Sequence, residues 1–282
     1  MRFKAEARAL YYNAYHLGKK NKHRSGKQGS DPHLVELDAI LDEKMVAGKV
    51  DVGVLEIPVD QIVGVANAVD KELYTHDFMP LTPTGTEYAD QWCALYQHYL
   101  SDEGIRCPIT CYEYLGRFYV LDGKKRVSVL KSHGAATICA AVTRILPVKT
   151  EDEEIQRYYE FLDAFEKTRL YQVAFTQPDS FPKLQKALGY DADHVWTEGD
   201  RFSFMFNWYG IERAFQQAFG GYMKVTTADA LMVLLEDYTY DQIRKTQSWV
   251  LARLFQAAWK KLYVIHNPTA SVALAEEIRK VS

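Results

Sequence analysis

The segment Arg117–Gly134, with the sequence RFYVLDGKKRVSVLKSHG, is the part of the chain that indicates the fold class most clearly. It predicts a strand of β-branched and aromatic residues at 118–121, a tight turn at Asp122-Gly123, and a helix that stops at Gly134. Another strand is predicted directly afterwards, at 137–145. Strand, helix and strand in this order are typical of an α/β unit.

Upstream of this segment the same alternation continues. Short β-branched runs predict strands at 52–57 and 107–114, and apolar periodicity predicts a helix at 86–100. Two prolines and a glycine in 79–85 predict a loop, since they cannot continue a helix. We therefore expect an α/β domain over residues 50–146, within an α+β protein.

Residues 1–49 are predicted to form a helical N-terminal arm. One helix covers residues 1–20, and Gly18 marks where it starts to end. A second helix runs from about residue 33 to Gly48. Between them, residues 19–30 have almost no apolar content and predict a mobile linker. Its cations are Lys19, Lys20, Lys22, Arg24 and Lys27. Through residue 30 there are eight Lys or Arg residues against Glu6 alone, which suits either a DNA backbone or an ordinary solvated linker.

Residues 147–282 are predicted to form a helical domain. Helices are expected to open near Glu151, at Ser180, at Asp200 and at Thr226, and a last long helix is expected over 240–264. On the helix that opens at Asp200, an apolar stripe faces a core; its members are Phe204, Trp208, Ile211, Phe215 and Phe219. Three further aromatics, Phe202, Phe206 and Tyr209, lie off that stripe. The helix is therefore expected to be buried on two sides, in a bundle against the α/β domain or in a homodimer interface.

Bulk composition narrows the classes of partner. The net charge is −3, so there is no overall basic field and any DNA contact needs a local patch. No stretch approaches 18 apolar residues, and the first residues lack a signal-peptide pattern. The four cysteines are unevenly spaced, which argues against a disulfide framework. These features predict a cytoplasmic protein with no membrane partner.

The start of the predicted helix after Asp122 carries the strongest chemical signal. Lys124, Lys125 and Arg126 occupy its first turn, at the positive end of the helix dipole, where exposed cations cost about 0.3–1 kcal/mol each. A bound anion would reverse that sign, because Gly123 leaves the turn open and backbone N–H groups point outward. The pattern favours an oligophosphate ligand. The alternative is that the cations pair with carboxylates of the chain itself, such as Asp102 or Glu103.

The run from Gly104 to Arg126 resembles the shared core of the ParB/sulfiredoxin superfamily: a Pro-Ile strand, a hairpin, and an Asp-Gly-x-x-Arg box that opens a helix. The segment 56–62 is similar to the opening strand of that family, and 131–138 to its glycine turn into a further strand. The similarity covers about one third of the chain, residues 50–146. It implies a nucleoside triphosphate ligand, ATP or CTP, whose phosphates are held by Asp122, Gly123, Lys124, Lys125 and Arg126.

Members of that superfamily differ in what they do with the nucleotide. The box here lacks the catalytic cysteine of sulfiredoxins, so reduction of a sulfinic acid is not expected. In free-serine kinases a Glu near the first strand acts as base, and Glu56 is the matching candidate, provided that it is buried; Mg²⁺ would accompany the nucleotide. Asp122 is a second catalytic candidate, since it could orient Arg126 or a phosphate-bound metal, although Asp before Gly is also a common turn residue.

The preferred interpretation is a ParB-like nucleotide-binding module that is regulatory or associated with DNA. A phosphotransferase that uses Glu56 is the alternative. A ParB-like nuclease ranks third, because the sequence shows no cluster of carboxylates suited to two metal ions.

Overall fold

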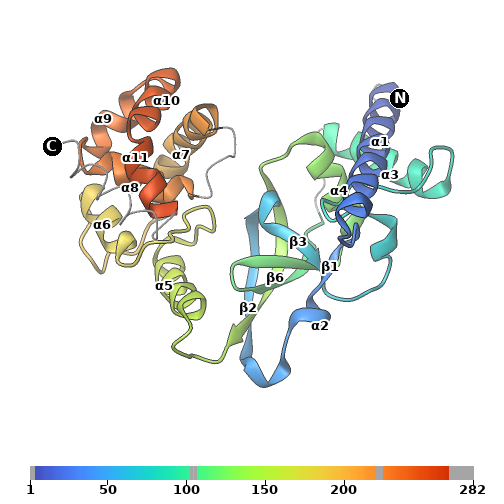
Figure 1. Ribbon diagram of the computed structural model, residues 1–282, viewed down its shortest axis with the longest axis horizontal. Helices are drawn as coiled ribbons and strands as arrows, with labels where there is room; N and C mark the ends of the chain where they lie inside the picture. The colour runs from blue at the N-terminus through green and yellow to red at the C-terminus, as the bar shows by residue number, and fades with distance from the viewer. Residues whose placement is uncertain (1–3, 102–103, 105–106, 220–224, 267–282) are drawn as a thin grey trace. The chain divides into compact units, whose positions relative to one another are not determined.

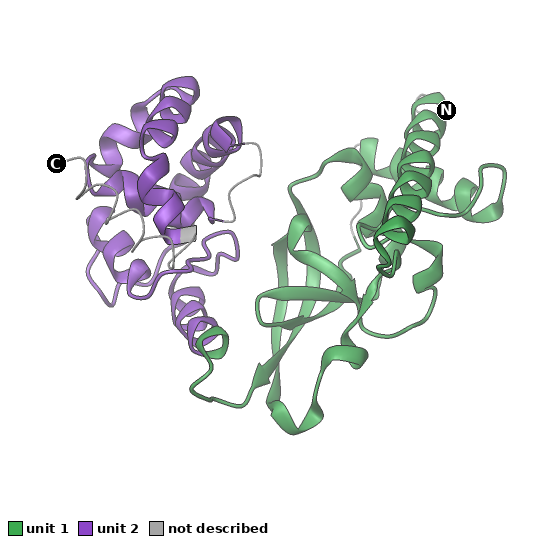
Figure 2. Cartoon of the chain, in the orientation of Figure 1, with its two compact units in different colours: residues 1–155 green, residues 156–282 purple. Residues whose placement is uncertain are grey.

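The computed structural model describes residues 4–101, 104, 107–219 and 225–266 of the 282-residue chain. The chain divides into two compact units, residues 1–155 and 156–282, which Figure 2 shows in green and purple. The boundary lies nine residues after the expected end of the α/β domain at 146, and the N-terminal arm belongs to the first unit. The protein combines helices with one mixed sheet, as expected for an α+β protein.

Unit 1 is built on a six-stranded sheet in the order β1-β3-β5-β4-β6-β2 (Figure 1). The pairs β1–β3, β3–β5 and β4–β6 are parallel, whereas β4–β5 and β2–β6 are antiparallel. The strands are β1 (Val35–Glu36), β2 (Val46–Pro58), β3 (Ile62–Val65), β4 (Ile109–Tyr114), β5 (Arg117–Asp122) and β6 (Thr137–Pro147). The four strands expected from the sequence correspond to β2, β4, β5 and β6, and are confirmed.

Three helices pack together in unit 1: α1 (Lys4–Gln28), α3 (Glu87–Leu100) and α4 (Lys124–His133). Their shared core includes Tyr11, Trp92 and Val129, all nearly or fully buried. The Trp92 indole N–H donates to the Ser128 hydroxyl at 2.9 Å, which ties α3 to α4. Both expected helices, at 86–100 and after Gly123, are therefore confirmed, the first with Thr86 as its N-cap.

The expected break in the arm is wrong, because α1 continues unbroken through residues 19–28. The buried stripe that begins at Ala7 and Tyr11 extends to Gly18 and Ser25. A Cβ at Gly18 would lie 2.5 Å from the Pro80 carbonyl oxygen, so this glycine allows a close approach rather than ending the helix. Farther along, the Asn21 amide donates to Asp77 at 2.7 Å. Tertiary contacts thus supply the helix stability that the composition of 19–30 lacks.

The expected second helix over 33–48 is also wrong. The segment forms β1, a short helix α2 (Leu37–Ile40), a 3₁₀ turn at Glu43–Met45, and the start of β2. Leu37 packs in a buried cluster with Tyr119 and Ile145, which belong to different strands. These contacts from distant parts of the chain override the local helical pattern.

Unit 2 is helical, as predicted, and has one extensive core. Its helices are α5 (Glu153–Thr168), α6 (Ser180–Ala187), α7 (Glu198–Phe219), α8 (Thr227–Leu235), α9 (Tyr240–Lys245), α10 (Ser248–Ala257) and α11 (Trp259–His266). The expected stripe on α7 is confirmed, since Phe204, Trp208 and Phe215 are buried in this core. No helix in the described part of the chain is long and apolar enough to cross a membrane.

One expectation for unit 2 is corrected. The last long helix is three helices, α9, α10 and α11, because Ile243, Phe255 and Leu262 all reach the same core and a straight helix could not bring them there. On the expected second apolar side of α7, Phe202 is 75% and Phe206 is 76% exposed in the single chain, so the core of unit 2 does not cover them and a homodimer interface there stays a prediction.

Candidate functional site

The turn between β5 and α4 requires glycine. Gly123 has φ +106°, in the left-handed region where side chains are strained. A Cβ at this position would also lie 2.5 Å from Cγ2 of Ile109 on β4. The turn therefore packs directly against the neighbouring strand, with no room for another residue type.

The backbone amides in the first turn of α4 have no partner among the described residues. The first backbone N–H with a helical partner is that of Val127, which donates to the Gly123 carbonyl at 3.0 Å. Among the described residues, no side chain caps the helix start, and its first turn contains no acid. The N–H groups of Lys124, Lys125 and Arg126 lie before Val127 at the positive end of the helix dipole. This is the arrangement that attracts a phosphate.

Arg126, expected to close over a phosphate, is engaged by the protein itself. Its guanidinium donates to the carbonyls of Cys107 and Pro108, at 2.8 and 2.7 Å, and pairs with Asp122. Its side chain is only 16% exposed. Arg126 therefore joins the start of α4 to the chain entering β4.

The two lysines differ in their surroundings. Lys125 donates to the Gln91 side-chain oxygen, and its ammonium lies 5.0 Å from the centre of the Tyr88 ring on α3. Lys124 is half-buried and makes no hydrogen bond or ion pair with any described residue. Lys124 is thus the cation most readily available to an incoming anion. Lys125 would first have to break its contacts with Gln91 and Tyr88. The two carboxylates named as alternative partners, Asp102 and Glu103, lie outside the described residues.

Asp122 lies at the end of β5 with its side chain 75% exposed. Its partner is Arg126, four residues later, so of the two roles expected for it the structure shows the orientation of Arg126. Within the described ranges, no three His, Cys, Asp or Glu side chains gather where they could hold a metal ion.

The structure does not bring Glu56 to the box. Glu56 is exposed near the end of β2 and pairs with Cys139 of β6, whereas Leu55, Ala140 and Ile109 form the neighbouring row across three strands. Because successive side chains point to opposite faces of a sheet, Glu56 points away from the face on which Ile109 meets Gly123. A buried base beside the phosphates, as expected for a kinase, is therefore not formed by Glu56.

The expected basic linker is an exposed face of α1. Lys19, Lys20, Lys22, Arg24 and Lys27 are all exposed and lie off the buried stripe of the helix. Since α1 packs with α3 and α4 in one core, this basic face is fixed relative to the start of α4.

The contacts of the Arg126 guanidinium and of Lys125 could not be found from sequence motifs. The carbonyls of Cys107 and Pro108 and the side chain of Gln91 carry no motif, because they come from segments 18 to 34 residues away. The only sequence signal was the run of cations itself. No family model matches the chain, and no curated protein matches its sequence.

Proposed function

We propose that unit 1 is a nucleotide-binding module that holds the triphosphate of ATP or CTP at the start of α4. The observation that carries this proposal is the first turn of α4, in which three amides have no partner among the described residues and three cations face no acid of the same turn. An anion there would bind the amides and offset the unfavourable placement of the cations.

The order of elements around the box agrees with the proposal. A strand, a hairpin, a glycine turn, a helix and a further strand follow one another as β4, β5, α4 and β6, which is the order in the ParB/sulfiredoxin core that residues 50–146 resemble. The bound phosphates would contact the amides of residues 124–126 and the ammonium of Lys124, with Arg126 holding the turn. Mg²⁺ would arrive with the nucleotide, and Asp122 is the exposed carboxylate nearest to it in sequence.

The basic face of α1 supports a regulatory role connected with DNA. Its five exposed cations could neutralise a phosphate backbone, and its packing against α4 would let the nucleotide influence that contact. Charge reversal at Lys20 and Lys27 should weaken DNA binding and flatten its salt dependence. The phosphotransferase and nuclease alternatives have no comparable support, given the position of Glu56 and the scattered carboxylates of the described residues.

A thermal-shift panel tests the nucleotide site. ATP, CTP, GTP, inorganic tripolyphosphate and unphosphorylated nucleosides are compared, each with and without Mg²⁺, on the wild type and on Lys124→Ala/Lys125→Ala. A ligand at 100 times its dissociation constant adds about 2.7 kcal/mol to the folded state. Triphosphates should stabilise the wild type far more than the variant, whereas nucleosides should stabilise neither. If no phosphate compound stabilises the wild type, the proposed function is wrong.

Lys44→Ala/Lys49→Ala is a suitable control for the change of charge, since both lysines are exposed in unit 1 and lie outside the box. This control should retain the full shift with triphosphate. Arg126 is left unchanged in the panel, because its removal would alter the turn as well as the charge.

A further inference from the structure

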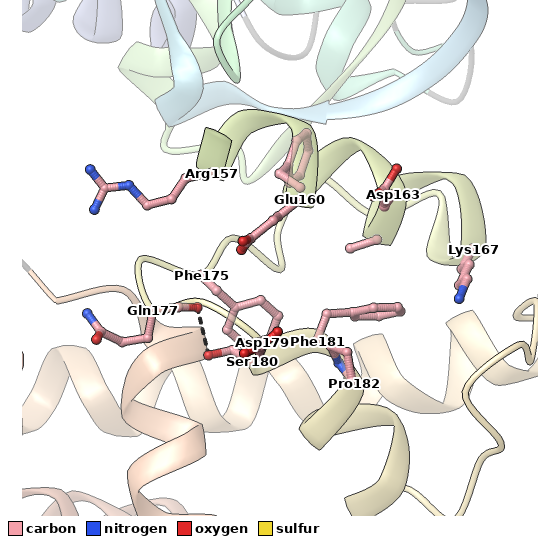
Figure 3. Close-up of a pocket in the computed structure, with 12 residues that line it drawn as sticks. Arg157, Glu160, Asp163, Lys167, Phe175, Gln177, Asp179, Ser180, Phe181 and Pro182 are labelled. Carbon is pink, nitrogen blue, oxygen red and sulfur yellow. Dashed lines mark hydrogen bonds between the residues drawn. The ribbon is translucent and has the colours of Figure 1, made fainter. Parts of the chain in front are cut away.

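Unit 2 contains a cavity that takes no part in the proposed nucleotide site. It has a volume of about 300 Å³ and lies between α5 and the segment that leads into α6 (Figure 3). All of its lining residues fall within 157–182, so the cavity belongs to unit 2 alone. A volume of this size, at the lower end of ligand pockets, suits a small molecule.

Three phenylalanines supply aromatic surface to the cavity wall. Phe161 and Ala164 come from α5. Phe175 and Phe181 come from the opposite segment, as Figure 3 shows. All three phenylalanine side chains are only half-buried. Apolar rings that remain partly open to solvent can pack on an apolar ligand and can attract a cation to their faces.

Two carboxylates without partners accompany these rings. Glu160 extends from α5 into the space above Phe175, and Asp179 lies at the start of α6 (Figure 3). Neither makes a hydrogen bond or ion pair with any of the residues that the structure describes. Asp179 also has φ +56°, a strained conformation for a residue other than glycine. The third acid of the lining, Asp163, points away from the cavity.

The cations of the lining are not placed to serve an anion. Lys167 donates to the Ala192 carbonyl at 2.7 Å and lies 4.0 Å from Asp193. Arg157 points away from the cavity, as Figure 3 shows. The start of α6 adds a partial positive charge, which Asp179 at that position offsets. The interior is therefore both apolar and negative.

We infer that this cavity binds a small organic cation with an apolar body, such as an arylalkyl ammonium. The ammonium group would lie between Glu160 and Asp179, and the apolar body would pack between Phe175 and Phe181. Because both carboxylates are exposed, the site gains selectivity from charge and most of its affinity from the rings.

Titration of the full chain by NMR or calorimetry with three matched probes tests the inference. The probes are 2-phenylethylammonium, 2-phenylethanol and phenylacetate, which share the aromatic body and differ in charge. The ammonium should bind most tightly, the alcohol several-fold more weakly, and the anion most weakly. The inference is overturned if phenylacetate binds as well as the ammonium, or if none of the probes binds at millimolar concentration.

Variants assign the binding to this cavity. Glu160→Gln and Asp179→Asn should each weaken ammonium binding about 2- to 5-fold and leave binding of the alcohol unchanged. Asparagine tolerates the left-handed conformation, so Asp179→Asn should remain folded. Glu166→Gln, which removes the same charge from an exposed residue of α5 outside the lining, is the matched control. An equal loss in Glu166→Gln would contradict the assignment.

Discussion

The first turns of α4 and α8 satisfy their backbone amides in opposite ways. At α8, the Thr226 hydroxyl accepts from the Asp229 N–H at 3.0 Å, and the buried Asp229 carboxylate accepts from the amide and hydroxyl of Thr176. At α4, the cap is a glycine and the first turn holds three cations. One helix start is completed by the chain itself, while the other is open to an anion. Under the proposed function, the start of α4 is kept for a ligand at some cost in stability.

The largest expected effect is at the closed helix start. Asp229→Ala should lower the free energy of unfolding by about 3 kcal/mol, because the amide and hydroxyl of Thr176 lose their acceptor inside the protein. Urea denaturation followed by circular dichroism measures the change. Asp237→Ala, which removes an exposed carboxylate beside Lys261, should cost less than about 1 kcal/mol. Equal losses in the two variants would show that the internal cap is not a source of stability.

The second largest loss of stability is expected at Gly123, which precedes α4. Gly123→Ala should cost about 2 kcal/mol, since it combines left-handed strain with a clash against Ile109. Gly134, at the other end of the same helix, has φ +81°, but a Cβ added there would have no atom within 4 Å. Gly134→Ala should cost about 1 kcal/mol, from strain alone. If the two variants were equally stable, the contact between Gly123 and Ile109 would not be as close as the structure shows.

A third prediction concerns acid. Hydrogen bonds from Thr197, Tyr190 and His194 hold the pKa of Asp200, in the first turn of α7, well below its ordinary value near 3.8. The ionised carboxylate therefore stabilises the fold fully above about pH 4, and this contribution is lost as the pH falls through the lower folded value. Asp200→Asn should destabilise the protein at neutral pH and reduce the loss of stability on acidification. Unfolding curves at pH 7 and pH 3 measure this difference, and an unchanged acid dependence would contradict it.

The smallest effect separates stability from binding. Lys124→Glu should raise the free energy of unfolding by about 0.3–1 kcal/mol in the ligand-free protein, because it places an acid at the positive end of α4. The same change should abolish stabilisation by triphosphate. Lys44 is an exposed lysine of the same unit, and Lys44→Glu should change neither the stability of the ligand-free protein nor its stabilisation by triphosphate. If Lys124→Glu instead lowered the free energy of unfolding without ligand, the cations at the start of α4 would not be unfavourably placed, and the argument for an anion site there would fail.

Local chemistry made part of this structure predictable from sequence. The β-branched runs of β2, β4, β5 and β6 were recognisable, as were the Gly123 turn, the Gly134 stop and the Thr226 cap, because each depends on neighbours within a few residues. The cations of the box were also recognisable, since three of them follow one another at a helix start.

What could not be predicted depends on contacts between distant segments. β1 has two residues and β3 has four, and both exist because they pair with strands elsewhere. Gly18 suggested a helix end, but its role is to admit Pro80, 62 residues later. In the site, Arg126 was expected to face a ligand, whereas the carbonyls of Cys107 and Pro108 fix it from a segment with no motif.

The most direct test of the account is the behaviour of the three amides at the start of α4. In a ¹⁵N-labelled full-length chain, the backbone N–H resonances of Lys124, Lys125 and Arg126 are followed while ATP, CTP, tripolyphosphate or an unphosphorylated nucleoside is added. We expect these three resonances to move together on addition of a triphosphate and to stay in place with the nucleoside. If they do not respond while triphosphate perturbs residues elsewhere, or if triphosphate perturbs nothing, the start of α4 is not a phosphate site.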